Sequence, residues 1–428
     1  MAADIPVNTQ LPGRGPVRLV LSDDLERKRL TVGFRWLLVI PHFFWLGIWG
    51  IGAFVAALAN WLATLVTGRP PVALHRFLAL YVKYATQVYG YFLLGAGPYP
   101  PFDGRPGYPV DVEIDAPAVQ SRLTVAFRIV LVLPALLLAG ALFGLPSTNS
   151  GSSGQLFSFS LGVAHVAAFL GWFVCVVRAR MSRGLRDCVV WGVGFGAQLW
   201  AYLLVLTSAY PDPDPAVVLG ELPRRSDPVG FEAGENLRRA RLTVLFRLPL
   251  AVPHLVWLAL WSVVALFAAV ANWVATLAQG RSPAPLHRFL SAYLRYQAHV
   301  YAFLLLIGNR FPGFAGGAGS YDAEASIAPP HTQNRWSVAF RLLLVLPAWF
   351  LASTFGSLAW MCAFLAWFAA LVTGRMPRRL LNASAQALRY TLQVSGYVLV
   401  LSDAYPYSGP SRQAAATSAP AAAESAFG

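Results

Sequence analysis

The chain has 428 residues, of which 57% are hydrophobic and only 12% are charged, and its mean hydropathy is +0.54. Soluble domains usually carry about 25% charged residues, so this composition argues against a soluble protein and indicates an integral membrane protein. The net charge is +14, but the arginines lie at the ends of apolar segments rather than on a soluble face with interleaved aromatics. We therefore expect membrane lipids as partners and no nucleic acid.

Residues 1–28 are expected to form a tail that contains a short strand, because Val17, Leu19 and Leu21 alternate with polar positions. Period-two alternation is typical of a half-buried strand. The same pattern recurs three times, at Val110, Val112 and Ile114, at Val229, Phe231 and Ala233, and at Ala323, Ala325 and Ile327. Three or more strands are about what an independent sheet needs, so the four strands are predicted to meet in one small extramembrane sheet.

A repeated phrase follows each strand. "RLTVGFRWLLVIPHF" begins at Arg29, and close copies begin at Arg122, Arg241 and Arg335. One straight helix from Leu30 to Val66 would measure about 55 Å, whereas the hydrocarbon core of a bilayer is about 30 Å thick. We therefore predict an interfacial helix, a kink or break at the proline and then a membrane-spanning helix, while a single kinked span stays open as the alternative. The phrase arginines are expected to reach lipid headgroups; they are Arg29, Arg35, Arg122, Arg128, Arg241, Arg247, Arg335 and Arg341.

A polar turn such as "TGRPPVALHR", a second and more polar helix, and a closing tyrosine-proline segment complete each copy. Two spans per copy predict about eight transmembrane helices. The fold class expected is an all-α integral membrane protein with four tandem helix-hairpin units, interfacial helices and the small β-sheet. The predicted units are 29–102, 103–211 with an inserted loop at 145–155, 212–314 and 315–408, followed by a disordered tail at 409–428.

The units are related in pairs. Arg35, His42 and Asn60 of unit 1 recur at a constant offset in unit 3 as Arg247, His254 and Asn272. Units 2 and 4 also pair, apart from the insertion, and they carry Gly171 and Ala366 where the asparagines stand. A two-unit ancestor that duplicated would explain this pattern.

The order of strand, "RLTVGFR" phrase, "NWLATLVTGRPP" turn and closing "YPPF" resembles bacterial, mainly actinobacterial, multi-pass proteins of domain-of-unknown-function family 4389 (DUF4389). The resemblance covers nearly the whole chain outside the tails. Unit 2 departs from it with "RARMSRG" at the turn, and unit 3 ends in "RFPGF". The family implies an integral membrane location, here the bacterial plasma membrane, and no established activity.

Membrane orientation is predicted from the basic residues. Arg27, Lys28 and Arg29 precede the first span and favour cytoplasmic termini and a cytoplasmic sheet. The dense basic turns argue the reverse, and we retain the cytoplasmic assignment as the expectation.

Polar residues recur on one face of each second helix, since residues four apart stack along a helix. Polar side chains in hydrocarbon normally face protein or a wet cavity, so this stripe is either a polar pathway or headgroup cleft, or a set of helix-helix hydrogen bonds. The stripe comprises Gln87, Gln198, His299 and Gln393, then Lys83, Arg295 and Arg389, with Tyr84, Tyr296 and Tyr390 at its edge.

The sequence nominates no catalytic residue, no cofactor and no metal site. The histidines have neither an H-x-x-x-H spacing nor nearby carboxylates, and no nucleophile motif or phosphate loop is present. We therefore expect that the protein is not an enzyme. Two functions remain open: a non-catalytic scaffold or envelope-organising protein, with membrane or envelope proteins as candidate partners, or a transporter, channel or lipid-handling protein that uses the stripe. The oligomeric state is not predicted.

Overall fold

The computed structural model describes residues 15–144, 146–147, 158–159 and 161–413. The predicted inserted loop at 145–155 lies almost wholly outside these residues, as do 414–428 of the predicted tail. Residues 409–413 instead pack onto the fold, where the short strands β5 (Arg224–Arg225) and β8 (Arg412–Gln413) pair in parallel.

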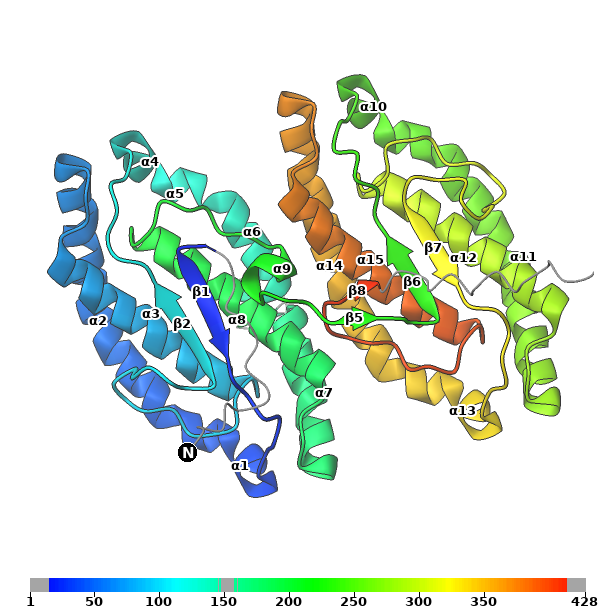
Figure 1. The fold of residues 1–428 in the computed structure, drawn as a ribbon, viewed down its shortest axis with the longest axis horizontal. Helices are drawn as coiled ribbons and strands as arrows, with labels where there is room; N and C mark the ends of the chain where they lie inside the picture. Colours follow the sequence, from blue (N-terminus) through cyan, green and yellow to red (C-terminus); the bar gives the residue numbers. More distant parts are fainter. Residues whose placement is uncertain (1–14, 145, 148–157, 160, 414–428) are drawn as a thin grey trace, which may run out of the picture.

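The protein is mostly helical, and its helices form four hairpins that lie in two neighbouring pairs (Figure 1). The first helices of the hairpins are α2 (Arg35–Thr67), α7 (Val163–Arg178), α11 (Arg247–Gln279) and α14 (Arg341–Thr373). The second helices are α3 (Val72–Phe92), α8 (Arg183–Leu203), α12 (Ala284–Leu304) and α15 (Arg378–Val398). The shorter helices are α1 (Arg29–Gly33), α4 (Arg122–Ala126), α5 (Arg128–Leu131), α6 (Leu133–Leu142), α9 (Pro215–Val218), α10 (Arg241–Leu245) and α13 (Arg335–Ala339).

Of the two alternatives expected at the proline, a kink or a break, the break is wrong in three of the four units. The helix passes through Pro41, Pro253 and Pro347, and the interruption lies earlier, at Phe34 in unit 1, where φ is −99° and ψ is 11°. The next residue is Arg35, which is buried and turned toward α3. The interruption therefore lies directly before an arginine whose side chain is buried in the protein interior. The interfacial segment α1, which precedes it, is only five residues long.

Unit 2 differs from the other three units in its first helix, which is shorter. The insertion divides its apolar stretch into α6 and α7, which have 10 and 16 residues. After the insertion the helix begins only at Val163. At about 1.5 Å per residue, α7 measures roughly 24 Å and is too short to cross hydrocarbon about 30 Å thick.

The four predicted strands form two separate sheets, so the single sheet is also wrong. β1 (Val17–Leu21) pairs with β2 (Val110–Ile114), and β6 (Val229–Glu232) pairs with β7 (Glu324–Ile327), both antiparallel. Each strand packs on a second helix of its own pair of hairpins, which keeps the two sheets apart. The remaining two-residue strands β3 (Pro146–Ser147) and β4 (Ser158–Phe159) pair beside the insertion.

The described residues therefore form three layers in each half: first helices, second helices and strands with their loops. Figure 1 shows the strands in front of the second helices, and the packing of α3 on both α2 and β2 illustrates the order. The core lies in the middle layer, where Tyr84, Trp191 and Tyr296 are fully buried. The outer layer is apolar and open, since Phe44 and Ile51 of α2 each expose 72% of their surface.

The two hairpins of each half run in opposite directions. The turn of one hairpin therefore lies beside the entry of the other, that is, the segment that leads into its first helix. The turn of unit 2 meets the entry of unit 1, because the backbone N–H of Arg27 donates to the carbonyl of Ala179 at 2.9 Å. The turn of unit 1 meets the entry of unit 2 through a 2.9 Å bond from the N–H of Gln120 to Gly68. Each end of a pair therefore holds the turn of one hairpin and the entry segment of the other. An orientation argument that places the turns and the entry segments on opposite sides of the membrane therefore fails.

Three of the described helices are long and apolar enough to cross a membrane, namely α2, α11 and α14. The second helices do not meet that description, and eight transmembrane helices are not supported. The coarser expectation holds: this is a mostly helical membrane protein with small sheets.

Candidate functional site

A narrow polar seam runs along the buried side of the first helices. In α2 it contains Arg35, His42, Asn60 and Thr64, all at most 2% exposed, although the rest of the helix surface is apolar. The corresponding seam of α11 contains Arg247, His254, Asn272 and Thr276. Polar groups in an apolar setting are stable when they are hydrogen-bonded, and most of these side chains bind the second helices or their closing turns.

The second arginine of each phrase holds the end of its second helix. Arg35 donates from Nη1 to the carbonyl oxygens of Tyr91, at 2.7 Å, and Ala96, at 3.1 Å, and its guanidinium lies 4.2 Å from the centre of the Tyr91 ring. The last carbonyls of a helix have no partner within the helix, so a cation here satisfies them and also complements the helix dipole. Arg128, Arg247 and Arg341 occupy the equivalent positions over Tyr202, Phe303 and Tyr397.

These contacts correct the predicted headgroup role of half the arginines. Arg35, Arg128, Arg247 and Arg341 are at most 2% exposed and cannot reach lipid. The first arginines of the phrases, Arg29, Arg122, Arg241 and Arg335, are exposed, and for them headgroup contact stays a prediction.

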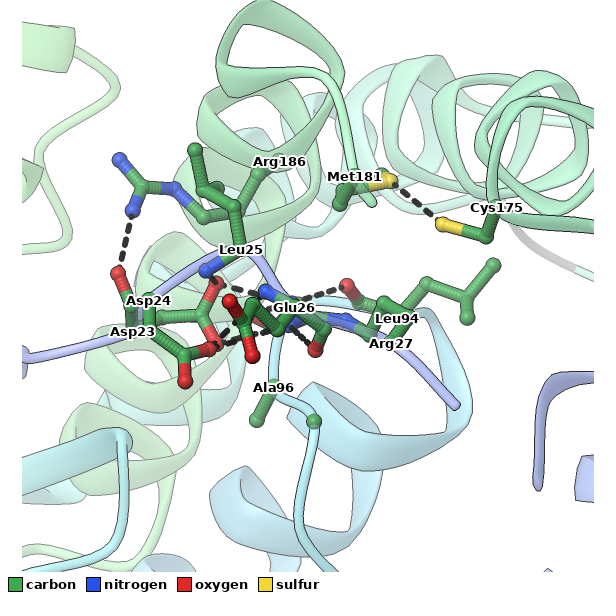
Figure 2. A network of polar contacts seen from close by, with 12 residues as sticks. Asp23, Asp24, Leu25, Glu26, Arg27, Leu94, Ala96, Cys175, Met181 and Arg186 are labelled. Atoms are coloured by element: carbon green, nitrogen blue, oxygen red, sulfur yellow. Dashed lines mark hydrogen bonds and ion pairs between the residues drawn. The ribbon is translucent and has the colours of Figure 1, made fainter. Parts of the chain in front are cut away.

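The turn after each second helix contains a residue in the left-handed conformation that is not glycine. These residues are Leu94, Val205, Leu306 and Val400, with φ between 59° and 65°. Such a conformation costs roughly 1–2 kcal/mol for a residue with a side chain, and side chains from outside the helix compensate by binding the carbonyls of these turns. In unit 1 that side chain is Arg27, which donates to the carbonyl oxygen of Leu94 at 3.0 Å (Figure 2).

Arg27 is itself held by a buried carboxylate. Its Nη2 lies 2.8 Å from Oδ2 of Asp23, and both side chains are at most 1% exposed. Figure 2 shows Arg186 reaching the same segment, where its Nη1 donates to the backbone carbonyl of Asp23. In unit 3 the equivalent Arg239 donates to Leu306 and Ile307 at 2.9 and 2.7 Å, and burial lowers the pKa of its guanidinium.

The two seam asparagines reach across to the partner hairpin. Asn60 Nδ2 donates to the carbonyl of Leu204 at 2.9 Å, and Asn272 Nδ2 donates to that of Leu399 at 3.1 Å. Units 2 and 4 receive these bonds at the turns that close their second helices. The corresponding turns of units 1 and 3 are bound instead by Arg27 and Arg239.

The four Gln and His residues of the predicted stripe do not meet. Each binds the strand or loop that covers its own helix: Gln87 donates to Asp111 Oδ1 at 3.3 Å, and His299 Nε2 lies 3.3 Å from Glu324 Oε2. Gln198 accepts from the N–H of Asp212 at 2.9 Å. Gln393 donates to Asp227 Oδ2 at 3.0 Å and accepts from the N–H of Tyr407 at 3.1 Å.

The tyrosines at the edge of the stripe face the first helices rather than the strands. Tyr84 Oη lies 2.6 Å from Nδ1 of His42, and Tyr296 makes the same contact with His254 at 2.8 Å. Tyr390 donates to the carbonyl of Ala348 at 3.3 Å. The second helices therefore present amides to the strands and phenols to the first helices, so the predicted stripe divides into two sets.

The cations of the stripe also bind locally. Lys83 Nζ lies 3.2 Å from Asp111 Oδ2, and Arg389 donates to the carbonyl of Gly409 at 2.6 Å. Arg295 is half-buried on α12. Lys83 lines an open groove of about 560 Å³ between α3 and β2, whereas Gln393 lines a separate cavity of about 20 Å³. Among residues 15–144 and the other described ranges, no group of three or more His, Cys, Asp and Glu is placed to hold a metal ion.

The chain matches one known protein family over three of its segments. The family described as "Domain of unknown function (DUF4389)" matches residues 29–103, 241–315 and 335–408, together more than half of the chain. The chain belongs to this family. Each DUF4389 match spans one hairpin with its entry phrase and closing loop, and the resemblance expected from the sequence is confirmed. Residues 104–240 lie outside the DUF4389 matches, so a further copy there stays a prediction, which the contacts of Arg128 favour because they are equivalent to those of Arg35.

No match was found among curated proteins or among solved structures.

The reciprocal contacts within each pair of hairpins were not predicted from the sequence. The indole of Trp61 binds the entry of unit 2, and that of Trp172 binds the entry of unit 1. A signal was present, since a tryptophan stands at this place in all four units: Trp61, Trp172, Trp273 and Trp367.

Proposed function

We propose that this protein is a non-catalytic scaffold embedded in one face of a bacterial plasma membrane. Its first helices form an apolar layer in the lipid, and its strands and closing loops form a polar platform, on the cytoplasmic side, for other envelope proteins. This replaces eight crossing helices with an arrangement in which the second helices lie between the lipid and the platform.

The observation that carries the proposal is the strand layer over the second helices. β1 buries Val17, Leu19 and Leu21, whereas its neighbour Arg18 pairs on the outer face with Asp115 at 2.7 Å. Open two-stranded sheets leave backbone groups unpaired, and hydrocarbon does not tolerate such edges. The strands therefore belong in water or among headgroups, and the second helices beneath them do not face lipid on that side.

The first helices support the same arrangement. α2, with 33 residues, measures about 50 Å, well beyond a hydrocarbon core of about 30 Å. Its buried residues form one seam, and large apolar residues such as Phe44, Ile51 and Phe54 cover the remaining surface. A helix with one polar seam and a broad apolar face can lie along the membrane plane with that face in the acyl region.

Transport is less well supported by the same contacts. A polar pathway needs groups that converge on a shared, wet space. Gln87, Gln198, His299 and Gln393 each bind a different covering segment. Hydrogen bonds to four different segments favour a structural role.

Spin-label accessibility tests the proposal in lipid nanodiscs. Single labels at Glu232 and Ser326 would report on the two strands, and labels at Phe54 and Phe267 on the middle of α2 and α11, where the side chains are 66% and 70% exposed. We expect the strand labels to contact a water-soluble nickel reagent and the helix labels to contact dissolved oxygen, which concentrates in lipid.

Oxygen-exposed, nickel-protected labels at both strand positions would contradict the proposal. That result would place the strand layer within the hydrocarbon and would restore a crossing arrangement for the second helices.

A further inference from the structure

The open groove between α3 and β2 is lined by residues of α3, by the end of β2 with the residues after it, and by Arg18. Its volume of about 560 Å³ is within the usual range of small-molecule sites, about 300–1,000 Å³. One wall is a single face of α3, where Val72, Arg76, Leu80 and Lys83 recur at helical spacing. The other wall is the end of β2 and the residues after it.

One basic and one acidic side chain on these walls are exposed and are not closely paired. Arg76 on the helix wall is exposed, and within the described residues no carboxylate lies within ion-pair distance of it. Glu113 on the strand wall has a side chain that is 56% exposed, and its contact with Arg18 is long, at 3.6 Å. The other lining charges are more tightly paired, Lys83 with Asp111 at 3.2 Å and Arg18 with Asp115 at 2.7 Å.

The groove also has an apolar side, next to the flank of α3 that packs on α2. Val72 and Leu80 expose 70% and 39% of their surface. Phe77, on the neighbouring stripe of α3, lies against Trp49 of α2, with 6.2 Å between ring centroids. An acyl chain in the layer of α2 would therefore meet the groove at its apolar side.

The second half of the chain shows that the fold does not require these charges. At the equivalent positions Glu113 is replaced by Ser326, Asp115 by Ala328 and Arg18 by Gly230, and the strand register aligns Gly230 with Ser326 as it aligns Arg18 with Glu113. Arg76 has its equivalent in Arg288. A cation without the facing acid is thus compatible with the same hairpin.

We propose that the groove binds one phospholipid whose headgroup is zwitterionic and ends in a primary ammonium, as in phosphatidylethanolamine. Arg76 binds the phosphate, Glu113 binds the ammonium, and Val72 and Leu80 pack against the acyl chain. Charge-assisted contacts of both signs select this headgroup over an anionic one. The inference rests on the membrane location proposed above.

Native mass spectrometry of the full chain in detergent tests the site, with dioleoyl phosphatidylethanolamine and dioleoyl phosphatidylglycerol as probes. We expect one ethanolamine lipid to bind preferentially, and the variants Arg76→Gln and Glu113→Gln each to weaken it at least ten-fold. Arg288→Gln, the matched control in unit 3, is expected to bind as the unaltered protein does.

Equal affinity for the two lipids, or an equal loss with Arg288→Gln, would overturn the proposal. A loss with Arg76→Gln alone, together with preference for the glycerol lipid, would also overturn it in favour of a plain anion site. Flotation with phosphatidylcholine vesicles separates this site from the membrane location: the groove variants must still float, and failure of the unaltered protein to float would defeat the proposed function instead.

Discussion

The indole N–H of Trp61 donates to the backbone carbonyl of Val125, 2.9 Å away in the partner hairpin. The indole N–H of Trp172 likewise donates to the backbone carbonyl of Val32 at 3.2 Å, so each hairpin donates one such bond to the other. Trp273 and Trp367 repeat the exchange in the second half, at 2.7 and 3.0 Å. The structural unit is therefore a pair of hairpins.

The first prediction concerns these indoles. Trp61→Phe keeps an aromatic ring but leaves the carbonyl of Val125 without its donor, and one such bond is worth about 1 kcal/mol. We expect the free energy of unfolding in detergent to fall by about that amount, measured by denaturant titration. Trp36→Phe is the control, because Trp36 is 70% exposed and its change should have little effect. A loss as large in the control would mean that ring volume, not the bond, matters.

The second prediction concerns Arg35. Arg35→Gln removes the cation from the end of α3, so the carbonyl of Ala96 loses the Arg35 donor and that of Tyr91 keeps only the backbone N–H of Leu94. We expect a loss of about 3 kcal/mol, since bonds to charged groups and unsatisfied buried groups weigh more than neutral exposed ones. Thermal unfolding in detergent measures it.

The matched control is Arg29→Gln in the same phrase. Arg29 is exposed and makes one bond, to the carbonyl of Val177 at 2.9 Å, so its loss should cost less than 1 kcal/mol. Similar costs at both arginines would show that the phrase arginines share one role.

The third prediction concerns the turn of unit 2. Gly68, Gly280 and Gly374 end the first helices of the other units with φ between 68° and 75°, and Ala179 occupies the same place with φ of 56°. Ala179→Gly should stabilise the protein by about 1 kcal/mol, because glycine adopts this conformation without strain. Calorimetry in detergent would measure the gain.

The reciprocal change is Gly68→Ala. A methyl group there would meet no atom closer than 3.8 Å, so only the backbone conformation opposes it, and we expect a comparable loss. A destabilising Ala179→Gly would show that the alanine methyl contributes more by packing than it costs in strain.

The sequence predicts the repeats, the hairpins and the positions of the strands, because each depends on local periodicity. It misplaces the helix interruption, since Pro41 is read as a break although the chain turns where Arg35 enters the protein. It also treats Arg29 and Arg35 alike. One is exposed and the other buried, a difference that only the position of α3 decides.

The stripe shows a second limit of local patterns. Helical spacing correctly places Gln87 and Tyr84 on the second helix but cannot say that one faces β2 and the other α2. Long-range pairing of strands with the partner hairpin creates that division. The seam of α2 could have been found, because Arg35, His42, Asn60 and Thr64 are the polar residues of one stripe in an otherwise apolar helix.

We propose above that α2 lies along one face of the membrane. The segments that flank its two ends can be tested with single cysteines at Leu30, in α1, and at Arg69, both exposed, in a chain whose buried native residues Cys175, Cys188 and Cys362 are replaced. A membrane-impermeant maleimide is added to sealed, uniformly oriented vesicles. We expect both positions to react from the same side, and labelling of the two positions from opposite sides would rule out this arrangement.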